Sequence, residues 1–188
     1  MQYPNGIKKQ FVNINSHSNR GMNLEADLND TNEYYRYNDI AIIHKKPTPI
    51  TINKVDYKSR CDAIIKEAHF KVPSTTDYNG IYKGKYIDFE AKETQSKTAF
   101  ALSNIHEHQI KHLKNINNHK GIAFLIVRFT TINETYLLTA DKLINFIENI
   151  DRKSIPICYF KENAYLIKDS YRPRIDYLKI IDNLIGGK

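Results

Sequence analysis

With 188 residues, 41% apolar side chains and 13 tyrosines, the chain is long and apolar enough to bury a core, which excludes a disordered protein. Its longest apolar run, Ile122–Val127, is far shorter than the roughly 20 residues that cross a bilayer, so we expect no membrane segment. The 28 Lys and Arg residues against 21 Asp and Glu residues favour a polyanionic partner, with nucleic acid before an anionic membrane surface. The chain has no apolar signal core, and its two cysteines form no CxxC pair, which indicates reduced thiols in a cytoplasmic protein.

The beginning of the chain is basic and has little apolar periodicity. Residues 1–20 contain Lys8, Lys9 and Arg20 and no acidic residue. This composition predicts a mobile basic arm. We expect residues 21–188 to form a single domain.

Helical spacing of Leu24, Leu28 and Tyr35 predicts a helix over residues 21–37. Three residues are available to cap it: Ser18, Asn19 or Asn23. Residues 39–50 then form an apolar stretch that ends at two prolines, which predicts a strand that stops there.

Residues 44–71 form a long basic excursion between elements of the core. They contain seven Lys and Arg residues and three acidic residues. "ITINKV" alternates like a strand, and "DAIIKEAHFK" fits either a second strand or a short helix. We expect this segment to project from the domain, and we call it the stalk.

The rest of the chain alternates strands and helices. Residues 102–119 are predicted to be helical, with Leu102, Ile105, Leu113 and Ile116 on one face. The remaining predictions are a central strand over 121–129, a strand over 134–140, a helix near 140–150 and a final amphipathic helix over 174–185. This order predicts an α/β fold with a mixed sheet between helices.

The stretch "STTDYNGIYKGKYIDFEAKE", residues 74–93, gathers acidic residues in a basic chain. A two-residue turn at Lys83–Gly84 would place Asp77 opposite Glu90 and Thr75 opposite Lys92. Strand alternation puts Asp88, Glu90 and Lys92 on one face, with Phe89 and Ala91 on the other. Two facing carboxylates therefore need a cation between them.

Such a site suits Mg²⁺, which binds through a few carboxylates and keeps several waters. Lys92 would lie one pleat away and stabilise charge on a phosphoryl oxygen, which fits metal-assisted hydrolysis of a phosphodiester. The same alternation also fits a solvated strand face with weak ion pairs. Gln109 lies within the apolar stripe of the 102–119 helix, where it is either a satisfied core amide or a metal contact.

This stretch resembles the PD-(D/E)xK nuclease signature, in which Asp77 is followed by "DFEAK". More specifically, the segments "SNRGMNLEADLNDTNEYY", "IHKKPTP", "IKEAHFK", "STTDYNGIYKGKYIDFEAKET" and "RPRIDYLK" resemble the RecU family of Holliday junction resolvases. The resemblance runs from about Ser18 to Leu178. It implies a restriction-endonuclease-like fold, with a central mixed sheet flanked by helices and a projecting basic stalk.

The resemblance also implies the roles of individual residues. Asp77 and Glu90 match metal carboxylates and catalytic residues, Thr75 and Gln109 match further metal contacts, and Lys92 matches a transition-state stabiliser. We expect Glu25 and Asp88 to support the site. The implied cofactor is Mg²⁺, one or two ions per site, with Mn²⁺ as a substitute.

The stalk matches the part of the family that enters the open centre of a four-way junction. Its candidate DNA contacts are Lys45, Lys46, Arg60, Lys66, Phe70 and Lys71. For each of these residues, a solvated surface charge or, for Phe70, a core contact is the alternative.

The resemblance implies a homodimeric endonuclease of the cytoplasm, at the nucleoid, that cuts Holliday junctions by symmetric paired nicks in recombination and DNA repair. A C2 dimer would present one active site to each of two like strands. Recombinase or branch-migration proteins are further candidate partners. Two alternatives stay open, namely a duplex-specific repair nuclease on this fold and a non-catalytic protein that binds DNA or anneals strands.

Overall fold

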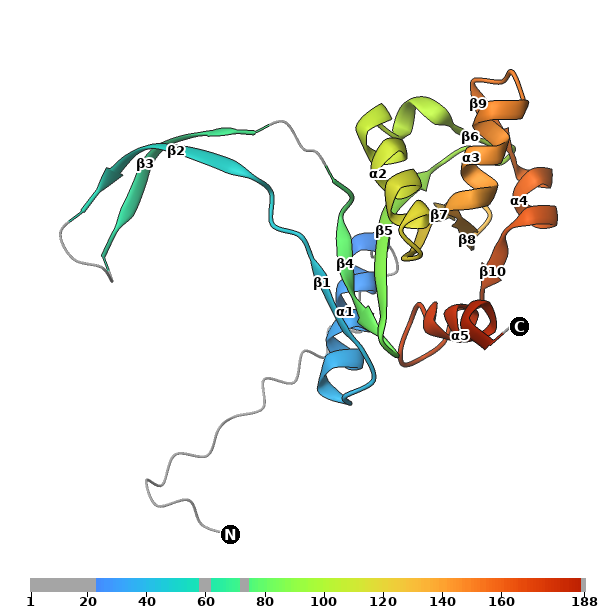
Figure 1. The fold of residues 1–188 in the computed structure, drawn as a ribbon, viewed down its shortest axis with the longest axis horizontal. Coiled ribbons are helices and arrows are strands. Elements are labelled where there is room, and N and C mark those ends of the chain that lie inside the picture. Colours follow the sequence, from blue (N-terminus) through green and yellow to red (C-terminus); the bar gives the residue numbers. More distant parts are fainter. Residues whose placement is uncertain (1–22, 58–61, 72–74, 187–188) are drawn as a thin grey trace, which may run out of the picture.

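The computed structural model describes residues 23–57, 62–71 and 75–186, which form a three-layer α/β/α body with a projecting ribbon (Figure 1). The predicted basic arm of residues 1–20 lies outside this part of the chain. Within it, no helix is long and apolar enough to cross a membrane.

A six-stranded mixed sheet is the middle layer, in the order β1-β4-β5-β7-β8-β10. Its strands are β1 (Ile42–Lys45), β4 (Tyr78–Tyr82), β5 (Lys85–Thr94), β7 (Ile122–Phe129), β8 (Glu134–Thr139) and β10 (Tyr165–Ile167). Strands β5 and β7 run parallel, and the other neighbours run antiparallel. The predicted strands over 121–129 and 134–140 are therefore confirmed, with the first in the centre of the sheet.

Helices cover both faces of the sheet, which confirms the predicted arrangement. Their bounds are α1 (Leu24–Tyr37), α2 (Glu107–Asn118), α3 (Ala140–Asn149), α4 (Ile157–Asn163) and α5 (Leu178–Gly186). One buried cluster joins α1 and α5 to one face, and a second joins α2, α3 and α4 to the other. A short second sheet pairs β6 (Ala99–Ala101) with β9 (Ser154–Pro156) beside a 3-10 turn, Leu102–Asn104.

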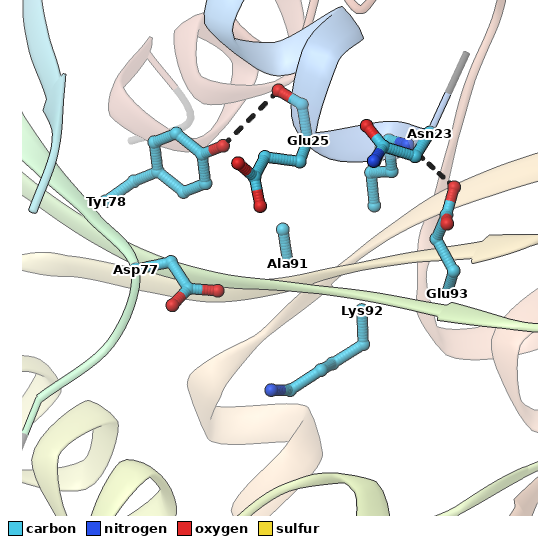
Figure 2. A pocket seen from close by; sticks show the side chains of 8 residues that line it. Asn23, Glu25, Asp77, Tyr78, Ala91, Lys92 and Glu93 are labelled. Carbon is cyan, nitrogen blue, oxygen red and sulfur yellow. Dashed lines mark hydrogen bonds between the residues drawn. The ribbon is translucent and has the colours of Figure 1, made fainter. Parts of the chain in front are cut away.

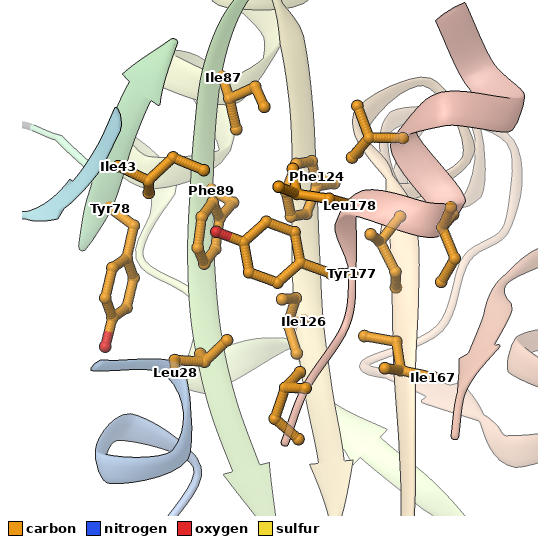
Figure 3. Close-up of a cluster of buried hydrophobic side chains, with 14 of the residues drawn as sticks. Leu28, Ile43, Tyr78, Ile87, Phe89, Phe124, Ile126, Ile167, Tyr177 and Leu178 are labelled. Carbon is orange, nitrogen blue, oxygen red and sulfur yellow. The ribbon is translucent and has the colours of Figure 1, made fainter. Parts of the chain in front are cut away.

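An aromatic stack anchors the central strands on the face covered by α1 and α5 (Figure 3). The ring of Phe89 stacks between those of Tyr78 and Phe124, with centroids 4.8 Å and 4.7 Å apart, and Tyr177 packs against it at 5.2 Å. Because strand side chains alternate, burying Phe89 here turns Glu90 to the opposite face. Apolar packing thus sets the direction of the acidic side chains.

Two predicted helices begin later than expected. The helix expected over 102–119 starts at Glu107, because His106 and Gln109 form a reciprocal capping box there. The last helix, expected over 174–185, starts at Leu178. Ile175 instead forms a bridge with Asp169 and donates its backbone N–H to Thr31.

The other two predicted helices are confirmed. Helix α1 begins where Asn23 accepts a hydrogen bond from the backbone of Ala26, so Asn23 is the cap among the three candidates. Helix α3 occupies the predicted segment near 140–150.

The stalk is an antiparallel ribbon of β2 (Ile50–Asp56) and β3 (Ile64–Phe70) that extends away from the body (Figure 1). "DAIIKEAHFK" is therefore a strand rather than a helix. Every residue of β3 is exposed, and β2 has a single partly buried residue, Thr51. The ribbon thus contributes no buried residue to the core, as expected for a projection.

Candidate active site

The hairpin of β4 and β5, which we call the central hairpin, has the predicted register. Tyr78 pairs with Phe89 and Asn79 with Asp88. The turn residues Lys83 and Gly84 both have positive φ, 48° and 72°, as a type I′ turn requires. The backbone N–H of Asp77 donates to Glu90 Oε2 at 3.1 Å. The two acidic residues therefore lie side by side, as the register predicted.

Glu90 is fully buried, and its environment favours a proton or a cation. Burial in the core, opposed by Lys92 and reinforced by Asp77, raises the pKa of Glu90 to about 7. Lys92 Nζ lies 2.6 Å from Glu90 Oε1, and the Lys92 side chain is 24% exposed. The buried acid and its neighbour thus meet a lysine whose side chain is partly exposed to solvent.

A cavity of about 200 Å³ opens at this end of the central hairpin (Figure 2). It forms where β4 begins at Tyr78, while β5 continues beyond the last paired residue, Phe89. The lining residues are Asn23, Leu24, Glu25, Asp77, Tyr78, Ala91, Lys92 and Glu93. Three of the predicted site residues, Asp77, Lys92 and Glu25, therefore share one cavity.

Helix α1 enters the cavity with its N-terminus. The backbone N–H of Leu24 donates to Glu93 Oε1 at 2.6 Å, and Lys92 points to the other side of β5 (Figure 2). A carboxylate is favoured at a helix N-terminus, so Glu93 fixes the start of α1. Glu25, one residue into the helix, forms an exposed ion pair with Lys45 at 2.5 Å. This places Glu25 at the site as a neighbour of the stalk.

Thr75 and Gln109 were predicted to contact the metal. Thr75 is half-buried and lies two residues before Asp77. Gln109 is buried on α2, and its side-chain oxygen accepts the backbone N–H of His106 at 3.0 Å. The amide of Gln109 thus has a structural partner within its own helix.

The predicted DNA contacts differ in their environments. Phe70 is 78% exposed, and Lys71 is also exposed. Lys66 lies 3.6 Å from Asp56, and both side chains are about half exposed. Among the predicted contacts that the structure describes, Lys46 alone is turned inward, with 17% of its side chain exposed and its Nζ 2.8 Å from Asp88 Oδ2. Arg60 lies outside the described residues.

Sequence reasoning missed two of these features. The bond between Glu93 and the start of α1 joins positions 69 residues apart, so no local pattern reports it. The inward direction of Lys46 had a signal. Lys45 and Lys46 are consecutive at the end of a strand, so they point to opposite faces.

The donors at the site fit a hard divalent cation. Asp77 and Glu90 offer adjacent carboxylate oxygens, and a buried glutamate with a raised pKa ionises at neutral pH when a cation replaces its proton. In the described part of the chain, no group of three or more His, Cys, Asp or Glu side chains is placed to hold an ion. The two carboxylates of Asp77 and Glu90 suit an ion that keeps several waters.

The mixed sheet between helices, with Asp77, Glu90 and Lys92 together at one end of its central hairpin, is the arrangement that the resemblance to PD-(D/E)xK nucleases implied. The family model for recombination protein U, RecU, matches residues 19–183. The chain belongs to the RecU family.

Two RecU proteins of similar length support this assignment. The Holliday junction resolvase RecU of Geobacillus sp. (strain WCH70) is 52% identical over 194 residues, covering 97% of this chain and 96% of the relative. The protein of that name from Bacillus mycoides (strain KBAB4) is 51% identical over 195 residues, covering 98% of both chains. The solved structure of the Holliday junction resolvase Hjc from Archaeoglobus fulgidus matches with a TM-score of 0.42 and 9% identity, over 73% of this chain and 89% of that one.

Proposed function

We propose that this protein is a metal-dependent endonuclease that resolves Holliday junctions in homologous recombination and DNA repair. The observation that carries the proposal is the contact between Asp77 and buried Glu90, with Lys92 Nζ beside them. Each nick breaks one P–O bond of the backbone and consumes one water. A polyanionic substrate also agrees with the formal net charge of +7.

The proposed cofactor is Mg²⁺, with Mn²⁺ as a substitute. Asp77 and Glu90 would hold the ion, with Thr75 and Gln109 as further oxygen donors. The carbonyl of Gln109 has a second lone pair beyond the one that accepts from His106, so both roles are compatible. When bound, the ion supplies a Lewis acid that activates water and polarises the phosphoryl oxygen.

Lys92 is the proposed transition-state stabiliser. Its ammonium group is held by Glu90 on the side of β5 opposite helix α1, where it is partly exposed and can donate to a phosphoryl oxygen as negative charge builds. Because the lysine is already fixed, little reorganisation is needed during the reaction.

The substrate preference is proposed to come from the stalk and from dimerisation. Exposed Lys66, Phe70 and Lys71 can neutralise phosphates and stack on unpaired bases. A C2 dimer would match the approximate two-fold symmetry of a four-way junction and give symmetric paired nicks. We place the protein in the cytoplasm at the nucleoid, with recombinase or branch-migration proteins as candidate partners.

The test is cleavage of a labelled mobile four-way junction and a matched linear duplex, in Mg²⁺ and in EDTA, beside the Glu90→Gln variant. We expect paired, symmetric nicks in the junction only, dependent on Mg²⁺ and absent from the variant. Equal cutting of duplex and junction would instead indicate a duplex-specific repair nuclease. Tight junction binding without cleavage in any divalent metal would indicate a DNA-binding or strand-annealing protein.

A further inference from the structure

Lys46 lies where the chain leaves the sheet for the stalk, one residue after β1 ends. Its backbone N–H donates to the carbonyl of Asp77 at 2.7 Å. Its Nζ donates to Thr76 Oγ1 at 2.9 Å and to Asp88 Oδ2 at 2.8 Å. Backbone and side chain of one lysine thus join the outgoing strand of the stalk to the segment that returns from it.

The partner of Lys46, Asp88, is a carboxylate with no solvent exposure. Besides Lys46, it accepts hydrogen bonds from Thr76 Oγ1 and from Tyr86 OH, the latter at 2.9 Å, and His112 Nε2 lies 3.3 Å from it. A buried carboxylate is stable only when its charge and hydrogen-bonding capacity are met. These donors meet that requirement. They come from β5, from α2 and from the stalk base, by which we mean Lys46 and Thr76 on the two segments that join the stalk to the sheet.

This cluster adjoins the proposed metal ligands along two strands. Asp88 and Glu90 share one face of β5, and Thr76 directly precedes Asp77. Because Thr76 is held by both Lys46 and Asp88, the segment before β4 is fixed relative to Glu90. That geometry is the one in which Asp77 contacts Glu90.

We propose that Lys46 and Asp88 are a pair of positioning residues that hold Asp77 against Glu90 and connect the stalk base to the metal site. This inference rests on the proposed function. It gives Lys46 a positioning role in place of the phosphate contact that the sequence predicted. Lys46 Nζ is mostly buried and already donates to Thr76 and Asp88, so turning it toward a phosphate would weaken the ion pair that the buried carboxylate of Asp88 needs. Lys45, its exposed neighbour, has no such constraint and can bind phosphate after releasing Glu25.

The experiment compares full-length wild type, Lys46→Met, Asp88→Asn, the double variant and Lys45→Met. Junction affinity is measured without Mg²⁺ at several salt concentrations, and the single-turnover cleavage rate at saturating protein. Mn²⁺ binding in the absence of DNA is followed by titration calorimetry. Thermal unfolding gives the melting temperature of each variant, and the other measurements are made below it.

For Lys46→Met we expect the saturating rate to fall about 10–100-fold, the size of a small misplacement of reacting groups. Mn²⁺ affinity should fall about 5–10-fold, with junction affinity and its salt slope unchanged, because no phosphate contact is lost. The double variant should lose no more rate than the worse single variant, because the two residues act as a unit. Lys45→Met should weaken junction binding and lower the slope of log affinity against log salt concentration by about one, because one phosphate contact is lost.

Two results would overturn the proposal. A lowered salt slope with a normal saturating rate for Lys46→Met would make Lys46 a phosphate contact. If the Lys46 and Asp88 variants have a normal cleavage rate and a normal Mn²⁺ affinity below their unfolding temperatures, the pair supports only the folding of the protein. A wild type that binds Mn²⁺ but cuts no junction would reject the proposed function alone, because Mn²⁺ binding still tests the pair.

Discussion

The stalk hairpin and the central hairpin contain similar residues but differ in what covers them. Both place isoleucines beside lysines and acidic residues. In the stalk, every residue of β3 is exposed, whereas four consecutive residues of β5, Ile87–Glu90, are fully buried. The covering layers are α1 and α5 on one face and α2 on the other.

This difference changes the chemistry of the same type of side chain. Glu67 in the stalk is exposed and accepts from Asn53 at 3.2 Å, an ordinary surface contact. Glu90 is buried, and its raised pKa shows that its charged form is unfavourable unless a cation lies beside it. Charged side chains are therefore solvated on the stalk, whereas those of Asp88 and Glu90 on the central hairpin are removed from solvent.

The largest expected effect comes from the acids of the central hairpin. Asp77→Asn and Glu90→Gln should each lower junction cleavage by more than about 10³-fold, because a metal ligand is lost. Junction binding should stay near normal or tighten, since negative charge near phosphate is removed. Glu67→Gln, the same chemical change on the stalk, is the matched control and should keep wild-type cleavage in a gel assay. Full activity in Glu90→Gln would disprove the metal assignment.

Loss of Lys92 should have the next largest effect. Lys92→Ala should lower the single-turnover rate by about 10²–10³-fold, the usual result of losing one contact to developing charge. Lys66→Ala on the stalk should instead weaken junction binding and leave the saturating rate unchanged. Equal losses of the saturating rate in Lys92→Ala and Lys66→Ala would contradict the proposal that the central hairpin acts in cleavage and the stalk in binding.

A moderate effect should appear in thermal stability. The pKa of Glu90 lies at about 7 in the folded protein against 4.5 ordinarily, so the folded state holds this proton more tightly. This contribution to the free energy of unfolding is complete below about pH 4.5 and is lost as pH rises through about 7. Mg²⁺ should therefore raise the melting temperature more at pH 8 than at pH 6, by a few degrees. At pH 8 most Glu90 side chains have already lost the proton that Mg²⁺ must displace at pH 6. Equal shifts at both pH values, or an unchanged difference in Glu90→Gln, would contradict this prediction.

The smallest effect is expected for the apolar side chain of the stalk. Phe70→Ala should reduce the preference for junction over duplex by about 5–10-fold, as loss of one stacked base would do. The melting temperature should not change, since Phe70 is 78% exposed. Competition binding with junction and duplex measures the ratio, and a large drop in melting temperature would show that Phe70 supports the fold instead.

The central hairpin was predictable from sequence because its determinants are local. Gly84 allows the positive φ of the turn, and alternation of Phe89 and Glu90 assigns the faces. The register that brings Asp77 to Glu90 follows from these two facts.

Other features depend on contacts between distant parts of the chain. Asp27 on α1 is buried against Arg128 at 2.6 Å and Arg174 at 3.0 Å, and these positions have no pattern in common along the sequence. The late start of α5 has a similar cause, since the backbone of Ile175 is bonded to Thr31 on α1. Such pairs become visible only when the fold brings the elements together.

Strands β1 and β4 are adjacent antiparallel neighbours, from Ile42 opposite Ile81 to Lys45 opposite Tyr78, and the stalk is the connection between them. It occupies the place of an ordinary hairpin loop. Closing a longer loop costs only about 0.6 kcal/mol for each doubling of its length, so the sheet tolerates connections of very different sizes. The architecture is therefore modular: the connection between β1 and β4 can differ in length and composition, while the strands of the sheet and the acidic residues beside them stay where they are.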